Sequence, residues 1–477
     1  MAMLSGQFGR FALQFFGTIL LARILAPTDY GLIAIVLVMI GLGEVVRDFG
    51  LSLAAIQSTT LNERERDNLF WANSFVGFSL TALAMASAPW FAQAFGDERI
   101  ANIVYVLAWT FAINGMAAQY RAGLNRSLKY GRLALVDTLG QAAGLIAGLA
   151  LAFAGAGYWA LAVQQITQAV ASLVVGVGFG RWRPKRYDRA TSISRFLRFG
   201  WPLVVTQLIG FASRNTDSVI IAQRFGPAAL GIYSRAFQLL MLPLNQINAP
   251  STQVALPVLA RLQTDRATFN RYLLRGQAVM TLFVCVLFVF LSFHADLVVA
   301  VLFGPKWHAS AGIFAILAFA GCFQVVSYAT YWAFLALGAT RSNLVFSIVS
   351  RSIVIAMVIG GSQWGIEGVA YGYALALVVT WPLGLWWISR FLKCPGVSML
   401  RNGVRSLVSA LILAAPSRFA EFALPDQPPL LVLALAGALL LVTGGVMTLV
   451  WPRFRKDIND FKRFVLSSVE KKKNKTI

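Results

Sequence analysis

The sequence predicts an all-α polytopic membrane protein with about 14 transmembrane helices. Three observations predict this class. Apolar and aromatic residues make up 58% of the 477 residues, and the mean hydropathy is +0.69. Only 13% of residues are charged, about half the usual share of about 25% in soluble proteins. The formal net charge is nevertheless +22, which excludes neither a membrane protein nor a nucleic-acid-binding protein by itself. Because so apolar a chain could not stay soluble, we exclude a soluble enzyme, a disordered chain and a nucleic-acid partner.

Fourteen segments are apolar over the roughly 20 residues that a membrane-spanning helix needs. They lie at 6–25, 31–56, 69–93, 100–119, 133–155, 158–180, 199–223, 230–256, 277–297, 311–337, 344–361, 365–388, 406–424 and 429–451. The thirteenth segment is the weakest, because Pro416, Arg418 and Glu421 interrupt it.

The basic residues fix the orientation of these spans. With the amino terminus inside, 32 of the 41 Lys and Arg residues fall in the termini and the even-numbered loops, and five fall in the odd-numbered loops. Cytoplasmic loops carry such an excess of Lys and Arg, so both termini are predicted to lie in the cytoplasm. The two histidines, His294 and His308, flank Lys306 in a predicted external loop, and we expect both to be solvated.

A short internal repeat predicts two lobes. The sequence ILLARILAPTDYG at 19–31 resembles VIIAQRFGPAALG at 219–231, and each contains a Pro-x-x-x-Gly turn between two spans. Six spans separate the copies, so the lobes share one topology and are related by a pseudo-two-fold along the membrane normal. The predicted parts are an N-lobe at 1–180, a basic cytoplasmic linker at 181–198, a C-lobe at 199–390, helices 13 and 14 at 391–451, and a basic cytoplasmic tail at 452–477.

Ionisable residues inside spans are the candidate functional residues, because they are costly in lipid and usually face a cavity. The four basic ones are Arg47, Arg214, Arg235 and Arg351, and the acids beside them are Glu44, Asp48 and Asp217. Arginine binds phosphate bidentately, which favours an anionic, phosphate-bearing substrate. Buried Arg–acid pairs that hold helices together explain the same residues about as well. The three acids are also candidates for ion or proton coupling.

No other chemistry stands out in the sequence. The three cysteines have no disulfide or metal spacing, and no nucleotide-binding loop occurs. We therefore expect no metal, no cofactor and no catalytic residue, and we expect that the protein is not an enzyme.

A series of short motifs carries a family resemblance. These are ARILAPTDYG at 22–31, RDFGL at 47–51, GAGYWAL at 155–161, WRP at 182–184, NTD at 215–217, LGIY at 230–233 and GPKW at 304–307. Together, and in this order, they resemble Wzx-type polysaccharide exporters of the WzxC-like branch. Those proteins belong to the multidrug/oligosaccharidyl-lipid/polysaccharide exporter superfamily. The resemblance covers nearly the whole chain.

The resemblance implies a bacterial inner-membrane flippase that moves undecaprenyl-pyrophosphate-linked oligosaccharides across the membrane by alternating access. It implies a cationic central cavity, a role that we carry to the four arginines as a hypothesis. The polar residues Asn73, Asn114 and Gln207 are candidates to touch sugars.

The expected partners are the lipid-linked oligosaccharide, membrane lipids and other polysaccharide assembly proteins, and the chain is expected to be a monomer. Two alternatives stay open. One is a drug or lipid II exporter of the same fold, and a drug exporter is expected to favour acids in its cavity. The other is a membrane polysaccharide polymerase or ligase.

Overall fold

The computed structural model describes residues 2–48, 61–452 and 454–455, and within them every regular element is a helix. Ten helical segments in this part of the chain are long and apolar enough to cross a membrane. The predicted class, an all-α polytopic membrane protein, is confirmed. Contacts within the chain divide it into two compact units, Met1–Ser234 and Arg235–Ile477. Most of the predicted tail, and the last part of the second predicted span, lie outside the described residues.

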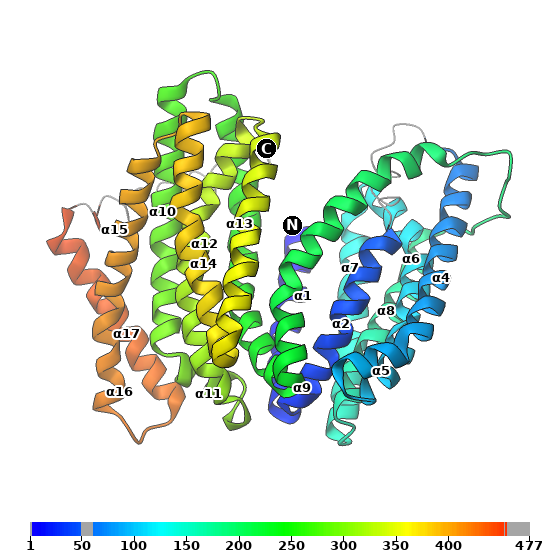
Figure 1. The fold of residues 1–477 in the computed structure, drawn as a ribbon, viewed down its shortest axis with the longest axis horizontal. Helices are drawn as coiled ribbons and strands as arrows, with labels where there is room; N and C mark the ends of the chain where they lie inside the picture. The colour runs from blue at the N-terminus through cyan, green and yellow to red at the C-terminus, as the bar shows by residue number, and fades with distance from the viewer. Residues whose placement is uncertain (1, 49–60, 453, 456–477) are drawn as a thin grey trace. The chain divides into compact units, whose positions relative to one another are not determined.

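Among its described residues, the first unit contains seven complete helices and the start of an eighth (Figure 1). They are α1 (Ala2–Ile24), α2 (Pro27–Asp48), α4 (Glu63–Phe95), α5 (Arg99–Leu107), α6 (Trp109–Arg126), α7 (Tyr130–Phe153), α8 (Tyr158–Gly180) and α9 (Ser194–Arg261). Inside this unit α7 packs along α8, α4 along α6, and α1 along α7. Helix α9 consists of two helical stretches that meet at Gly226, where φ is +80°.

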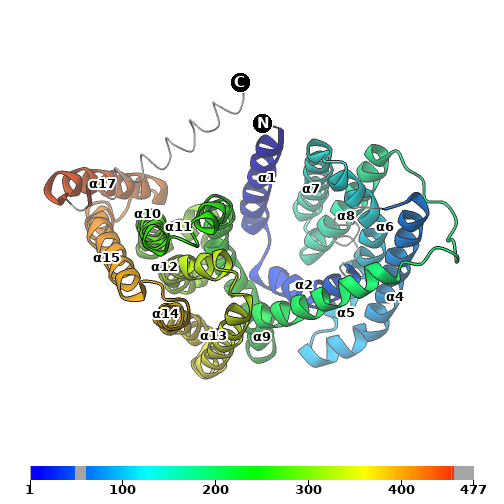
Figure 2. The ribbon, with the colours of Figure 1, turned by 90° about the horizontal axis from the view of Figure 1, so that it is seen from above.

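The second unit holds the rest of α9 and the later helices (Figures 1 and 2). These are α10 (Arg266–Phe293), α11 (Ala295–Leu302), α12 (Ala309–Ala336), α13 (Thr340–Gly361), α14 (Gly365–Leu392), α15 (Gly396–Ala414), α16 (Phe419–Ala423) and α17 (Pro429–Val450), with short 3₁₀ turns at Pro305–Trp307, Ser362–Trp364 and Ala415–Arg418. Here α10 packs on α12 and α15, and α14 packs on α12 and α13.

Small residues bring helices close together where lipid supplies no hydrophobic driving force. Gly140, Gly144 and Gly148 recur every four residues along α7 and face α8. A Cβ atom on Gly144 would lie 2.6 Å from the backbone oxygen of Gln164 in α8. The backbones of α7 and α8 therefore touch along this stripe, and a larger side chain would separate them.

The repeated Pro-x-x-x-Gly turns pack directly against each other inside the first unit. A Cβ atom on Gly31 would lie 1.6 Å from the backbone oxygen of Pro227, and a Cβ atom on Gly231 would lie 1.8 Å from that of Pro27. The contact is reciprocal, with the glycine of each copy against the proline of the other. The sequence predicted the repeat, and the structure shows that its two copies form one backbone-to-backbone contact.

A second repeat relates three consecutive helices of each unit. The ends of α6 and α12, Arg126 and Ala336, are 210 residues apart, as are the starts of α7 and α13, Tyr130 and Thr340. Both connections use a left-handed residue, Leu128 in one and Gly338 in the other. The ends of α8 and α14, Gly180 and Leu392, are 212 residues apart, so α6, α7 and α8 of the first unit have counterparts in α12, α13 and α14 of the second.

Several predicted boundaries are wrong. Helix α15 begins at Gly396 and ends at Ala414, about ten residues before the predicted thirteenth span, because Pro416 opens a separate turn and the arginines near its start are accommodated in the helix. Helix α10 begins at Arg266, capped by Asp265, and α6 continues to Arg126. The expectation that His294 is solvated is also wrong, because its side chain is fully buried.

Candidate functional site

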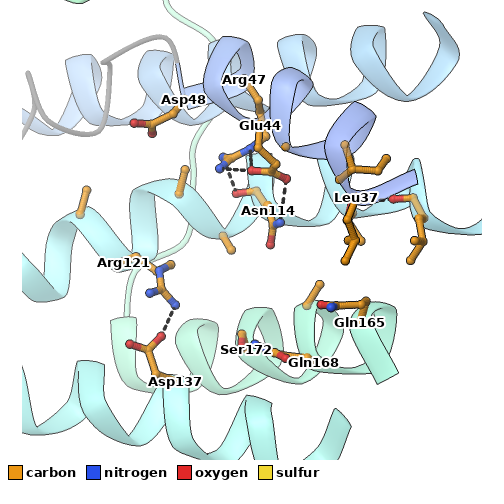
Figure 3. Close-up of a pocket in the computed structure, with 18 of the residues that line it drawn as sticks. Leu37, Glu44, Arg47, Asp48, Asn114, Arg121, Asp137, Gln165, Gln168 and Ser172 are labelled. Carbon is orange, nitrogen blue, oxygen red and sulfur yellow. Dashed lines mark hydrogen bonds and ion pairs between the residues drawn. The ribbon is translucent and has the colours of Figure 1, made fainter. Parts of the chain in front are cut away.

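A cavity of about 630 Å³ lies inside the first unit among α2, α6, α7 and α8 (Figure 3). We call it the charged cavity, because its lining includes five ionisable residues: Glu44, Arg47, Asp48, Arg121 and Asp137. Apolar and small side chains of the same helices complete the walls. The charged residues come from three different helices, so helix packing, not one local motif, builds the site.

One cluster in the cavity joins α2 to α6. The Arg47 guanidinium contacts Glu44 Oε2 through Nε and Nη2, both at 2.7 Å, and Nη1 donates to the backbone oxygen of Asn114 at 3.2 Å. The Asn114 side-chain amide donates to Glu44 Oε1 at 2.9 Å. Three predicted site residues therefore meet in one hydrogen-bonded cluster. Asp48, also predicted, lies one residue beyond Arg47 and lines the same cavity.

A second ion pair in the cavity joins α6 to α7. Arg121 Nη1 lies 2.7 Å from Asp137 Oδ1 (Figure 3). Sequence reasoning missed this pair, because it placed Arg121 in a cytoplasmic loop and Asp137 at the membrane interface. With all groups ionised, the lining holds two arginines and three carboxylates, a formal charge of −1. The lining is therefore charged but carries no net positive charge.

Gln165, Gln168 and Ser172 of α8 also line the cavity, on the side away from the α2 cluster (Figure 3). The sequence held a signal for them. Their spacing of three and four residues puts three polar side chains on one face of a mostly apolar helix. Asn114, Arg121 and Asn125 form a similar stripe on α6. Of the neutral polar residues, only Asn73, Asn114 and Gln207 were put forward from the sequence, so Asn125 and the three residues of α8 were overlooked.

Four predicted residues of the first unit lie away from the lining of the charged cavity. Asn73 is fully buried in α4, where its backbone oxygen packs on Gly115 of α6. Gln207 and Arg214 are exposed along α9. Asp217 is buried and accepts hydrogen bonds from the Tyr233 hydroxyl at 3.0 Å and from the Ser218 amide at 2.8 Å, so it does not use Arg214 as its partner.

The other two predicted arginines belong to the second unit. Arg235 lies on the second stretch of α9 and Arg351 lies in the middle of α13, and both are half-buried. Of the four predicted arginines, Arg47 alone lines the charged cavity. The described residues hold no group of three or more His, Cys, Asp or Glu placed to bind a metal ion.

The fold and the cavity define a class: a polytopic α-helical membrane protein with a polar cavity enclosed by apolar helices. The family described as polysaccharide biosynthesis proteins matches residues 20–312. The chain belongs to this family of membrane proteins.

Two relatives agree with this membership, and one solved structure has a similar fold. The chain is 25% identical over 416 residues to the lipopolysaccharide biosynthesis protein WzxC of Escherichia coli, covering 85% of this chain and 82% of that protein. It is 21% identical over 425 residues to the succinoglycan biosynthesis transport protein ExoT of Rhizobium meliloti, covering 86% and 83%. Its fold is similar to that of the lipid II flippase MurJ in an inward closed conformation, with a TM-score of 0.72, 15% identity, and coverage of 94% and 98%.

Proposed function

We propose that the protein is a flippase that moves lipid-linked oligosaccharide units from the cytoplasmic to the external leaflet of a bacterial inner membrane. Its family membership carries the proposal, because the match places it among polysaccharide biosynthesis proteins. Two names support the transport step: one relative is a succinoglycan transport protein, and the protein with the similar fold is a lipid II flippase. In this proposal both termini are cytoplasmic, the protein is not an enzyme, and two lobes alternate in access.

Arg47 is the proposed contact for the pyrophosphate. In the resting cavity its guanidinium is held by Glu44, at 2.7 Å. A phosphate oxygen can take the place of the Glu44 carboxylate, because both accept from the same fork of N–H groups. The exchange places Glu44 and Asp48 beside the bound anion, and in this proposal these two carboxylates are the groups that couple transport to an ion gradient.

Complementation of a deletion strain tests the role of Arg47. Arg47→Ala should lower surface polysaccharide on the order of tenfold or more, because a hydrogen bond to a charged group contributes about 1.5–3 kcal/mol and 1.4 kcal/mol is a factor of ten. Arg47→Lys should restore part of it. Arg64→Ala is the matched control, because Arg64 is 76% exposed and lies outside the cavity. Normal polysaccharide with Arg47→Ala, at normal membrane levels, would contradict the assignment.

Glu44→Gln provides the opposite test. It keeps the shape of the side chain and removes the charge that competes for Arg47. We expect the purified variant to bind sodium pyrophosphate more tightly than the wild type and to support less export, because release becomes slower. Weaker pyrophosphate binding in this variant would show that Glu44 helps to hold the ligand and does not compete with it.

The three carboxylates of the charged cavity favour a second candidate function, the export of cationic small molecules. This function predicts a different phenotype. A deletion strain would keep normal surface polysaccharide and lose resistance to cationic dyes. The flippase proposal expects the reverse, with lipid-linked oligosaccharide accumulating on the cytoplasmic side.

A further inference from the structure

The second unit contains a smaller cavity that no charged residue lines. It measures about 200 Å³ and lies among α12, α13 and α14. We call it the neutral cavity. All of its described lining residues are uncharged, and they include the hydroxyls of Ser327, Thr330 and Ser350 and the rings of Tyr331 and Trp381. Its volume is below the roughly 300 Å³ at which drug-sized pockets begin, so it suits one small ligand group.

The neutral cavity occupies the positions that the charged cavity occupies in the first unit. Asn114 and Gln324, which line the two cavities, are 210 residues apart. The same offset relates Arg121 to Tyr331 and Asp137 to Ser347, and all four of these residues are lining residues too. The end of α6 and the start of α7 share this offset with the end of α12 and the start of α13.

The two cavities are therefore counterparts with different chemistry. Where the first unit has the ion pair between Arg121 and Asp137, the second has Tyr331 and Ser347. Duplicated helices thus enclose a site for charge in one unit and a site without charge in the other. A phosphate would find no cation in the neutral cavity, and a cationic drug would find no carboxylate.

Two buried polar groups in the neutral cavity have no protein partner. The Thr330 hydroxyl and the Trp381 indole N–H both line it, and these residues are only 4% and 6% exposed. Leaving such groups without a partner costs stability, and a ligand acceptor would remove that cost. Ser327 and Ser350 donate to backbone oxygens of their own helix, which leaves their hydroxyl oxygens able to accept.

We propose that the neutral cavity binds an uncharged sugar of the transported saccharide. A sugar hydroxyl both donates and accepts, which matches the mixture of donors and acceptors here. The indole and phenol rings offer apolar faces for the C–H groups of a sugar ring. The proposal rests on the proposed flippase function and adds a division of roles: the first unit holds the pyrophosphate and the second selects the sugar.

Two nearly isosteric variants of the full chain test the proposal. Thr330→Val removes the hydroxyl, and Trp381→Phe removes the indole N–H. Trp387→Phe is the matched control on the same helix, because the Trp387 N–H donates to Ser342 Oγ at 2.8 Å and Trp387 does not line the cavity. Each protein, in lipid nanodiscs, is titrated with undecaprenyl pyrophosphate without sugar and with the lipid-linked oligosaccharide extracted from the deletion strain.

We expect the sugar-bearing lipid to bind wild type at least tenfold more tightly than the sugar-free lipid. The Thr330→Val and Trp381→Phe double variant should lose that advantage, keep its affinity for sugar-free lipid, and have an equal or higher thermal midpoint. The Trp387→Phe control should keep the advantage and have an equal or lower midpoint. An advantage kept within twofold in the double variant would overturn the sugar site while the flippase proposal stands. If wild type bound neither lipid, the flippase proposal would fail first.

Discussion

At the scale of single residues, adding one methyl group at Gly31 should strongly destabilise the protein. A Cβ atom there would overlap the backbone oxygen of Pro227 at 1.6 Å. Backbone atoms cannot move aside as a flexible side chain does, so the two turns must separate. We expect Gly31→Ala, and equally Gly231→Ala, to destabilise the protein by more than about 4 kcal/mol, the range of the most severe point substitutions.

Thermal unfolding of the detergent-purified protein, together with its amount in the membrane, measures this effect. Gly437→Ala is the matched control, because a Cβ atom there meets nothing within 4 Å. Within helix α17 that change should be neutral or stabilising by up to about 1 kcal/mol. Equal midpoints for Gly31→Ala and Gly437→Ala would show that the turns are not in tight contact.

His294 is a residue whose surroundings are built from distant parts of the chain. Its Nδ1 lies 2.7 Å from Glu421 Oε1, its Nε2 lies 2.8 Å from Ser417 Oγ, and Arg418 pairs with the same Glu421 carboxyl at 3.6 Å. Burial lowers the pKa of His294 below its usual 6.5, against the opposing effect of Glu421. Its partners follow more than 120 residues later, so the sequence predicted a solvated loop histidine.

A pH dependence of stability follows from that lowered pKa. Well above pH 6.5 the imidazole is neutral in both the folded and the unfolded chain, so protonation of His294 does not reduce the free energy of unfolding. As the pH falls below 6.5, the unfolded chain takes up the proton first, so stability decreases toward the folded-state pKa. Between pH 7.5 and 5.5 the thermal midpoint of wild type should fall more than that of His294→Gln. His308→Gln, at an exposed histidine, should follow wild type. Parallel curves for wild type and His294→Gln would contradict this.

At the scale of elements, one buried side chain of α4, Asn68, makes three hydrogen bonds to the basic linker after α8. Asn68 is fully buried, its amide donates to the backbone oxygens of Asp188 and Thr191 at 2.7 and 2.8 Å, and its Oδ1 accepts from the Asp188 amide at 2.8 Å.

We expect Asn68→Ala to release the linker and speed trypsin cleavage after the linker's arginines in inside-out vesicles. Trp71→Phe removes a single exposed hydrogen bond to Lys185 and should change cleavage far less. Unchanged cleavage in Asn68→Ala would exclude this anchoring role.

Helix positions were predictable from hydropathy, but several helix ends were not. Helix α8 occupies the predicted 158–180 because glycine and arginine flank a mostly apolar run that contains no charged residue. Helices α6 and α10 extend by a turn or more into polar sequence, because capping and packing continue beyond the apolar stretch. The charged α2 cluster was predictable, because Glu44 and Arg47 are neighbours on one helix. Arg121 and Asp137 were not, because their pairing depends on how α6 packs against α7.

At the scale of the whole molecule, the predicted orientation would account for most of the +22 charge, because most Lys and Arg residues fall in the loops and termini assigned to the cytoplasm. Intramembrane charge led to Arg47 and its neighbours, but it could not find the neutral cavity, which contains no charge. Its correspondence to the charged cavity follows from a position-by-position comparison of the duplicated helices. The internal repeat therefore carries more information about the site than the net charge does.

The orientation itself can be measured with cysteine labelling, because the chain's own thiols give little background. Cys285, Cys322 and Cys394 are all buried, and burial raises the pKa of Cys394 to about 11, so its reactive thiolate is scarce. We introduce one exposed cysteine at a time, Gln427→Cys between α16 and α17 or Tyr187→Cys in the linker. A membrane-impermeant maleimide should label the cysteine at 427 in intact spheroplasts and the cysteine at 187 only after permeabilisation. The reverse pattern would invert the topology, and with it the side from which a substrate enters the charged cavity.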